Sequence, residues 1–204
     1  MTTYATLKSD IAGWLLRDDL TAAIPSFVRL AEAAIRRDVR VRNMLKTSTL
    51  TLSDQSVALP SDFLEMQRIV LNSGVEWEIH YQPPSALYRN AMYWEAAGTP
   101  SYYTIEGEYL VFAPGPASSP EALISYYRKY DALSADSDSN WLLANHYDLY
   151  LYGALSHSAP YIKDDERVAL WSQGYSSALN GLTKSDRRST FAGGPLAVHG
   201  SVGP

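Results

Sequence analysis

The 204-residue sequence contains no cysteine, which excludes disulfides and thiolate chemistry, so the fold must depend on packing or on assembly. It has no apolar run near the roughly 20 residues that span a membrane, and "MTTYATLKSD" lacks the basic and apolar segments of a signal peptide. Basic residues number 17 against 22 acidic ones, a net charge of -5, which argues against a surface devoted to nucleic acid. We expect a soluble, intracellular protein.

The sequence contains enough apolar residues to form a hydrophobic core. Hydrophobic residues make up 46% of the chain, and its length suits one domain or one domain with a sizeable insertion. The 15 tyrosines and 5 tryptophans are amphipathic rings that suit interfaces as well as cores.

The two ends of the chain carry helical patterns. Apolar residues recur at helical spacing from Tyr4 to Leu15, with Thr3 available as the N-cap, and a second helix is predicted to begin near Pro25. The segment Trp141 to Ile162 is apolar on most sides, which predicts a central, surrounded helix. A narrow apolar seam from Val168 to Leu182 predicts a last helix, which ends around "KSDRRS".

The middle of the chain changes to a period of two, which is typical of strands. "TLTLSDQSVALP" predicts a hairpin, and "MQRIVLN" with "VEWEIHY" predicts a second hairpin around Ser73 and Gly74. "YYTIEGEYLVFAP" predicts two short strands about Gly107, and "EALISYYRKY" predicts one more strand. A short helix is expected after Pro83 and Pro84 in "PSALYRNAMYW", and "DALSADSDSN" is interpreted as a polar linker.

These patterns predict an α+β fold in three parts. A helical body of about four main helices would be discontinuous, formed by residues 1–46 and 131–190. A β-rich insertion would occupy residues 47–130, and an extended C-terminal arm would occupy residues 191–204.

Motifs for chemistry are missing from the sequence. There is no G-x-S-x-G, no H-E-x-x-H and no carboxylate loop of cation-binding spacing, and the four histidines occur in unrelated contexts. "AGGP" is not followed by a helix, so its glycines offer no phosphate site. The acidic runs at residues 18–19 and 164–166 are explained by helix termini. We therefore predict no catalytic residue, no metal and no cofactor, and a protein that is not an enzyme.

A cluster of cationic residues occupies the second predicted helix and its exit: Arg29, Arg36, Arg37, Arg40, Arg42 and Lys46. The spacing places Arg29, Arg36 and Arg40 on one helical face. One interpretation is a solvated face on which Glu32 pairs with Arg36 four residues later. The other is a surface that lines a DNA channel or contacts an acidic neighbour.

The ending "RRSTFAGGPLAVHGSVGP" can neither continue a helix nor solvate itself as a charged tail would. We expect it to bind a groove on another subunit, with glycines as a hinge, a proline that favours extension and apolar anchors. The predicted partner-binding residues are Phe191, Gly193, Gly194, Pro195, Leu196 and Val198.

Five segments in order resemble the head-to-tail adaptor proteins of tailed bacteriophages, in particular those of short-tailed phages and the tail-tube-A-like proteins. They are "LTLSDQSVALPSDFLEMQRIVLNSG", "GTPSYYTIEGEYLVFAPGP", "ISYYRKYDALS", "NWLLANHYDLYLYGAL" and "DRRSTFAGGPL". The resemblance runs through nearly the whole chain. Tyr147 stands where the pattern has a proline, a departure at a helix start.

The resemblance implies a structural virion protein that forms a ring of usually twelve copies. The ring would attach beneath the portal protein, with the C-terminal arm gripping the portal, and would offer a surface to the tail nozzle or tail tube protein. Its lumen would pass double-stranded DNA during genome ejection. The protein would assemble in the host cytoplasm, and it would bind no membrane.

Two alternatives remain open on the sequence. One is a non-viral scaffold module that oligomerises through its aromatic helices, and the other is a small hydrolase with a diffuse active site. Co-purification with a portal ring would separate the scaffold from the adaptor. The hydrolase would require a concave pocket with converging titratable groups, and the sequence nominates none.

Overall fold

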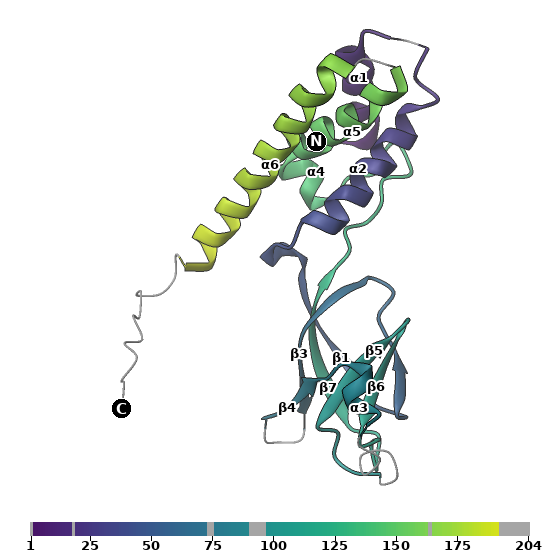
Figure 1. The fold of residues 1–204 in the computed structure, drawn as a ribbon, viewed down its shortest axis with the longest axis vertical. Helices are drawn as coiled ribbons and strands as arrows, with labels where there is room; N and C mark the ends of the chain where they lie inside the picture. Colours follow the sequence, from purple (N-terminus) through teal and green to yellow (C-terminus); the bar gives the residue numbers. More distant parts are fainter. Residues whose placement is uncertain (1, 18, 73–75, 90–96, 163–164, 192–204) are drawn as a thin grey trace. The chain divides into compact units, whose positions relative to one another are not determined.

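The computed structural model describes residues 2–17, 19–72, 76–89, 97–162 and 165–191 (Figure 1). The chain divides into two compact units. The first, Met1–Arg42 with Tyr130–Pro204, is called the helical unit, and the second, Asn43–Lys129, is called the β unit.

The helical unit packs its helices around α5. Its helices are α1 (Tyr4–Leu15), α2 (Ile24–Asp38), α4 (Trp141–Asn145), α5 (Tyr147–Ile162) and α6 (Asp165–Phe191). Helix α5 contacts α1, α2, α4 and α6, which is why its sequence is apolar on most sides (Figure 1). The N-caps follow the sequence: the Thr3 side chain accepts a hydrogen bond from the Thr6 N–H, and the Asn140 side chain accepts one from the Leu143 N–H.

Two glycines allow the helices around α5 to approach closely. A Cβ atom at Gly153 of α5 would lie 3.0 Å from the Cβ of Ala31 on α2. A Cβ atom at Gly174 of α6 would lie 2.8 Å from the ring of Tyr152 on α5. Any larger side chain at either position would push the neighbouring helix away.

The β unit contains a seven-stranded sheet in the order β1-β7-β3-β4-β5-β6-β2. Its strands are β1 (Leu45–Thr51), β2 (Ser56–Ala58), β3 (Phe63–Asn72), β4 (Glu76–Tyr81), β5 (Tyr102–Glu106), β6 (Tyr109–Ala113) and β7 (Glu121–Arg128). Neighbouring strands are antiparallel except for the parallel pair β4 and β5. A short helix, α3 (Pro84–Leu87), contacts β5, and the 3-10 turn η1 (Arg42–Met44) precedes β1.

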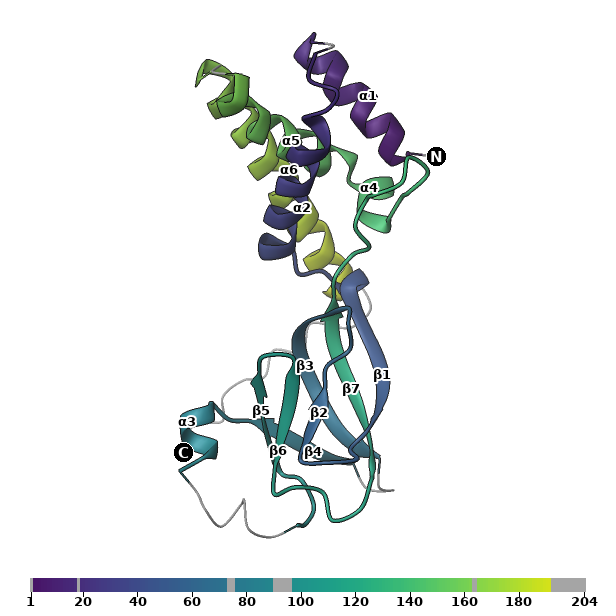
Figure 2. The ribbon, with the colours of Figure 1, turned by 90° about the vertical axis from the view of Figure 1, so that its right-hand side faces the viewer.

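The sheet curls into a half-barrel. Strands β1 and β2 lie at its opposite edges, yet only residues 52–55 connect them, so the two edges must approach at that end (Figure 2). The inward side chains form a core of their own: Leu52, Ile69, Leu71, Ile79, Tyr103, Leu110, Phe112, Ala122, Ile124 and Tyr126. Burial of this set stabilises the β unit at about 25 cal/mol per Å² of apolar surface.

The predicted strands are present, but one predicted hairpin is wrong. Strands β1 and β2 do not pair with each other; β1 pairs with β7 and β2 pairs with β6. The hairpins β3–β4 and β5–β6 are confirmed, and Gly107 adopts a φ of +59° at the turn between β5 and β6. The predicted turn at Ser73 and Gly74 lies outside the described residues.

The predicted fold class, a four-helix body with a β-rich insertion, is wrong. The described residues form six α-helices and a seven-stranded half-barrel with its own core, so the β part is more than an insertion in a helical body. The helix expected from Trp141 to Ile162 is broken at His146, whose φ of -136° and ψ of 58° are not helical. Alternation and apolar content predicted the element types but not their proportions.

The first residue of the predicted arm lies in a helix. Helix α6 continues through Phe191, which was predicted as the first residue of the arm. Residues 192–204 lie outside the described part of the chain.

Candidate functional site

The arginine surface of α2 consists of Arg29 and Arg36, which lie two turns apart and are exposed. The Nη2 atom of Arg29 donates a hydrogen bond of 3.2 Å to Ser26 Oγ. Arg40 lies beyond the last residue of α2, and its Nη1 atom donates to the carbonyl oxygens of Arg36 (2.9 Å) and Val39 (2.7 Å). Arg40 therefore caps the C-terminal carbonyls of α2, and the structure does not bring it onto one helix face with the other two.

The remaining cations of the predicted cluster have separate surroundings. Arg37 is exposed on α2, and burial, together with the charge of Arg37, lowers the pKa of His157. Lys46 lies on β1, and its Nζ atom is 2.7 Å from Asp62 Oδ2. The cationic residues that are close together in the sequence therefore lie in several different local environments.

Glu32 lies between Arg29 and Arg36 along α2, and its carboxylate is half-buried. Its Oε1 atom accepts a hydrogen bond of 2.9 Å from the N–H of Leu133. Burial raises the pKa of Glu32, and the Leu133 N–H and the charge of Arg36 oppose this rise. Glu32 therefore anchors the segment 131–140 to α2, besides its electrostatic interaction with Arg36.

The segment 131–140, predicted as a polar linker, is an ordered connection in the helical unit. The Oδ2 atom of Asp138 accepts hydrogen bonds from the N–H groups of Ser134 (2.8 Å) and Ala135 (2.7 Å), and these bonds lower the pKa of Asp138. The carbonyl oxygen of Asp138 accepts a hydrogen bond of 2.8 Å from the N–H of Tyr4 at the start of α1. The carbonyl oxygen of Asp136 accepts a second one, of 3.1 Å, from the N–H of Ala5, so the segment satisfies two of the N–H groups that a helix start leaves without a partner.

The C-terminal turns of α6 are joined to the exit of α2 through Arg42. The backbone N–H of Arg42 donates a hydrogen bond of 3.0 Å to Asp186 Oδ1. Its guanidinium donates from Nη1 to the carbonyl oxygen of Ser189 at 2.9 Å, and Nε lies 3.5 Å from Asp186 Oδ1. The carboxylate of Asp186 therefore has a cationic partner within the protein.

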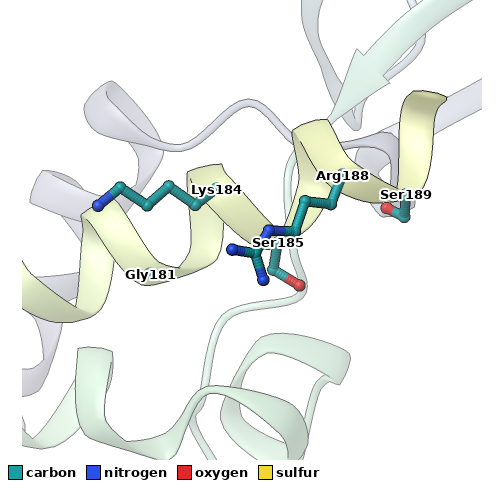
Figure 3. A pocket seen from close by; sticks show the side chains of 5 residues that line it. All are labelled: Gly181, Lys184, Ser185, Arg188 and Ser189. Atoms are coloured by element: carbon teal, nitrogen blue, oxygen red, sulfur yellow. The ribbon is translucent and has the colours of Figure 1, made fainter. Parts of the chain in front are cut away.

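An open concavity of about 510 Å³ lies beside these turns of α6. Its described lining residues recur at helical spacing on one face: Gly181, Lys184, Ser185, Arg188 and Ser189. In Figure 3 the Lys184 side chain runs back along the helix, and the Arg188 guanidinium lies toward Ser185. Sequence reasoning did not nominate this surface, because "KSDRRS" was interpreted only as the cationic end of a helix.

Within the ranges that the structure describes, no group of three or more histidine, cysteine or acidic side chains could hold a metal ion. None of the described helices is long and apolar enough to cross a membrane. His146 packs against the ring of Trp141, with ring centroids 5.4 Å apart.

The predicted residues of the C-terminal arm are mostly beyond the described part of the chain. Phe191 is the last residue of α6. Gly193, Gly194, Pro195, Leu196 and Val198 lie outside the described residues, so their role as portal-binding anchors stays a prediction.

Comparison with known proteins identifies the class. Residues 2–199 match the family model described as SU10 adaptor protein. No match is found among curated proteins. The family match covers nearly the whole chain and includes both units, so the protein is a structural adaptor of a bacteriophage. The chain belongs to the SU10 adaptor protein family, which confirms the resemblance to phage head-to-tail adaptors.

Proposed function

We propose that this chain is the subunit of a closed ring of about twelve copies that joins the portal to the tail, since oligomers of one chain close by cyclic symmetry. The lumen of the ring passes double-stranded DNA during genome ejection. The observation that carries this proposal is the adaptor family match over residues 2–199. Assembly takes place in the host cytoplasm, and the finished ring lies at the head-to-tail interface of the virion.

The two units contact different partners in this proposal. The C-terminal residues follow α6, so the helical unit binds the portal, with Leu196 and Val198 of the arm as anchors. The β unit binds the tail nozzle or tail tube protein. On its strand β4, Trp77 and Tyr81 are 48% and 57% exposed, and such rings are frequent in protein interfaces. Crosslinks from these two positions are expected to reach tail proteins, and crosslinks mainly to the portal would contradict this orientation.

The arginine surface of α2 contacts an acidic neighbour or lines the channel. Arg29 and Arg36 are exposed, and the Glu32 carboxylate between them is engaged by the Leu133 N–H. Exposed guanidinium groups in this arrangement are available to bind carboxylates or phosphates.

Ring formation is expected to require the portal. Copies of net charge -5 repel one another in a closed ring, and each arm lacks its receptor until the portal is present. The test is co-expression with the portal of the same phage, followed by pull-down and mass measurement of the complex. We expect a ring on the portal and a monomer or weak oligomer for the free protein. Stable free dodecamers at micromolar concentration, or no portal complex, would contradict the proposal.

A further inference from the structure

We propose that the C-terminal turns of α6 bind the phosphate backbone of double-stranded DNA through Lys184, Arg187 and Arg188. This inference deepens the proposed function, because it assumes that DNA passes the ring, and it adds a DNA contact on a surface separate from the arginine surface of α2. It concerns an electrostatic contact that reads no base sequence.

The geometry presents several donors on one helix end. Lys184 and Arg188 are one turn apart and line the concavity, and the Arg188 guanidinium lies toward Ser185 (Figure 3). Arg187 is exposed beside them on the next side of the helix. Lysine, arginine and serine side chains are the usual donors to phosphate oxygens, and the charged groups of Lys184, Arg187 and Arg188 can only donate, because they have no acceptor atom.

The local charge differs in sign from that of the whole protein. Residues 176–191 contain Lys184, Arg187 and Arg188 and a single carboxylate, that of Asp186, while the whole chain carries a net charge of -5. Asp186 accepts the N–H of Arg42 and lies 3.5 Å from its guanidinium. The three cations therefore keep their charge for an external anion.

Stabilisation of the helix end does not account for the whole cluster. Cations in the last turn of a helix interact favourably with its dipole, which explains Arg188. Lys184 precedes the end of α6 at Phe191 by two turns, where this effect has faded. Its position on the same concavity as Arg188 indicates a shared anionic ligand instead.

The surroundings favour a phosphate backbone over an acidic protein. Among the described lining residues, Gly181, Ser185 and Ser189 carry no large apolar side chain. Leu170, a large exposed apolar residue of α6, lies fourteen residues before Lys184, about 21 Å along the helix. Protein interfaces have an apolar, aromatic centre in which lysine is depleted, whereas DNA interfaces are polar and strongly cationic.

The test measures binding of the full-length protein to a labelled duplex by fluorescence anisotropy at two salt concentrations, about 50 and 200 mM. The double variant Lys184→Gln, Arg188→Gln is compared with the control Arg89→Gln, Lys129→Gln, which removes the same charge from the β unit. We expect weak binding that falls with salt, at least a tenfold loss in the α6 variant, and a salt slope smaller by about two. The control is expected to stay within about twofold of wild type.

Three outcomes would overturn the inference. The control could weaken binding as much as the α6 variant, which would show a general effect of charge. The duplex could fail to bind while an acidic polyglutamate peptide binds at Lys184 and Arg188, which would identify a protein partner. A salt dependence of DNA binding that is as steep in the α6 variant as in the wild type would also contradict the inference.

If circular dichroism shows that the double variant is unfolded, the single variant Lys184→Gln, at an exposed residue, is compared with the control instead. A portal pull-down of the α6 variant distinguishes a failure of this DNA-binding inference from a failure of the proposed function.

Discussion

The hydroxyl of Tyr147 donates a hydrogen bond of 2.5 Å to the carboxylate of Asp10, which links the first residue of α5 to α1. Burial and the neighbouring Asp10 raise the pKa of Tyr147 above its ordinary value of 10.0, so the hydroxyl keeps its proton at neutral pH. Tyr147 stands where the sequence resemblance to phage adaptors leads us to expect a proline. A proline would suit the start of a helix there, but it could not make this bond.

Replacing Tyr147 with Phe should lower the free energy of unfolding by about 1–2 kcal/mol, because a hydrogen bond to a carboxylate is lost while the ring remains. Urea denaturation at pH 7 measures the change. The matched control is Tyr152→Phe, since Tyr152 on α5 contributes its ring to Trp14 and Gly174, and we expect little effect. Equal losses in both variants would show that the bond to Asp10 adds nothing.

Glu32→Gln should change how stability depends on pH. The folded-state pKa of Glu32 is raised above 4.5, chiefly by burial, so the folded chain holds this proton more tightly than the unfolded chain. The resulting stabilisation is complete below pH 4.5 and is lost as pH rises through the folded-state pKa. Glutamine keeps an oxygen that can accept the Leu133 N–H but never ionises.

The variant should therefore match wild type near pH 4 and equal or exceed its stability at pH 7. Thermal unfolding across this range measures the difference. A variant that is less stable than wild type at pH 7, with the difference closing in acid, would show that attraction to Arg36 outweighs the burial of Glu32.

Local features of the fold followed from the sequence because they depend on neighbouring residues. Thr3 as an N-cap, the surrounded character of α5 and the hairpin turn at Gly107 are confirmed. The partners of β1 and β2 were not predictable in this way. Both strands are flanked by turn residues, and only the curl of the whole sheet decides that β1 joins β7 and β2 joins β6.

The candidate surfaces, too, could be predicted only in part from neighbouring residues in the sequence. Helical spacing placed Arg40 on one helix face with Arg29 and Arg36. Helix α2 ends at Asp38, however, so Arg40 lies two residues beyond the helix and donates to the carbonyl oxygen of Val39 instead. The segment 131–140 has the composition of a solvated linker. Its acidic side chains and carbonyls instead bind backbone N–H groups, and composition alone does not distinguish these two situations.

Gly174→Ala should destabilise the helical unit by about 1 kcal/mol, because the added methyl group would lie 2.8 Å from the Tyr152 ring and one of the helices must move. Gly181→Ala in the same helix is the control. No atom lies within 4 Å of a Cβ there, and alanine favours the helix by about 0.5–1 kcal/mol. Denaturant titrations should therefore give opposite signs, and stabilisation of both variants would contradict the close approach of α5 and α6.

Arg29→Gln with Arg36→Gln should leave the free energy of unfolding within about 0.5 kcal/mol of wild type, since exposed charges contribute little. Arg40→Gln should cost about 1 kcal/mol, because its bonds to the carbonyls of Arg36 and Val39 are lost. The double variant should be impaired instead in ring assembly on the portal. If it fails to fold, or assembles as wild type does, the arginine surface is not a partner contact.

The C-terminal arm should be dispensable for folding and required for docking. Residues 192–204 contain no Asp, Glu, Lys or Arg, and they include four glycines and two prolines. Such a segment cannot form an amphipathic helix on its own chain, so its removal should cost few native contacts. Because α6 runs through Phe191, the informative truncation ends there and keeps the Arg42 contact to Ser189.

On the portal, burial of Leu196 and Val198 would contribute roughly 1.5–3 kcal/mol each. Fixing the backbone costs about 1–2 kcal/mol per residue, so two anchors cannot order a dozen residues. Main-chain hydrogen bonds to a portal strand or groove must supply part of the difference, and attachment of many copies around the ring must supply the rest. The chain truncated after Phe191 should therefore keep the circular dichroism and melting temperature of the full-length protein while its portal complex is lost. A truncated chain that melts well below the full-length protein would show that residues 192–204 belong to the core of this protein and not to a partner.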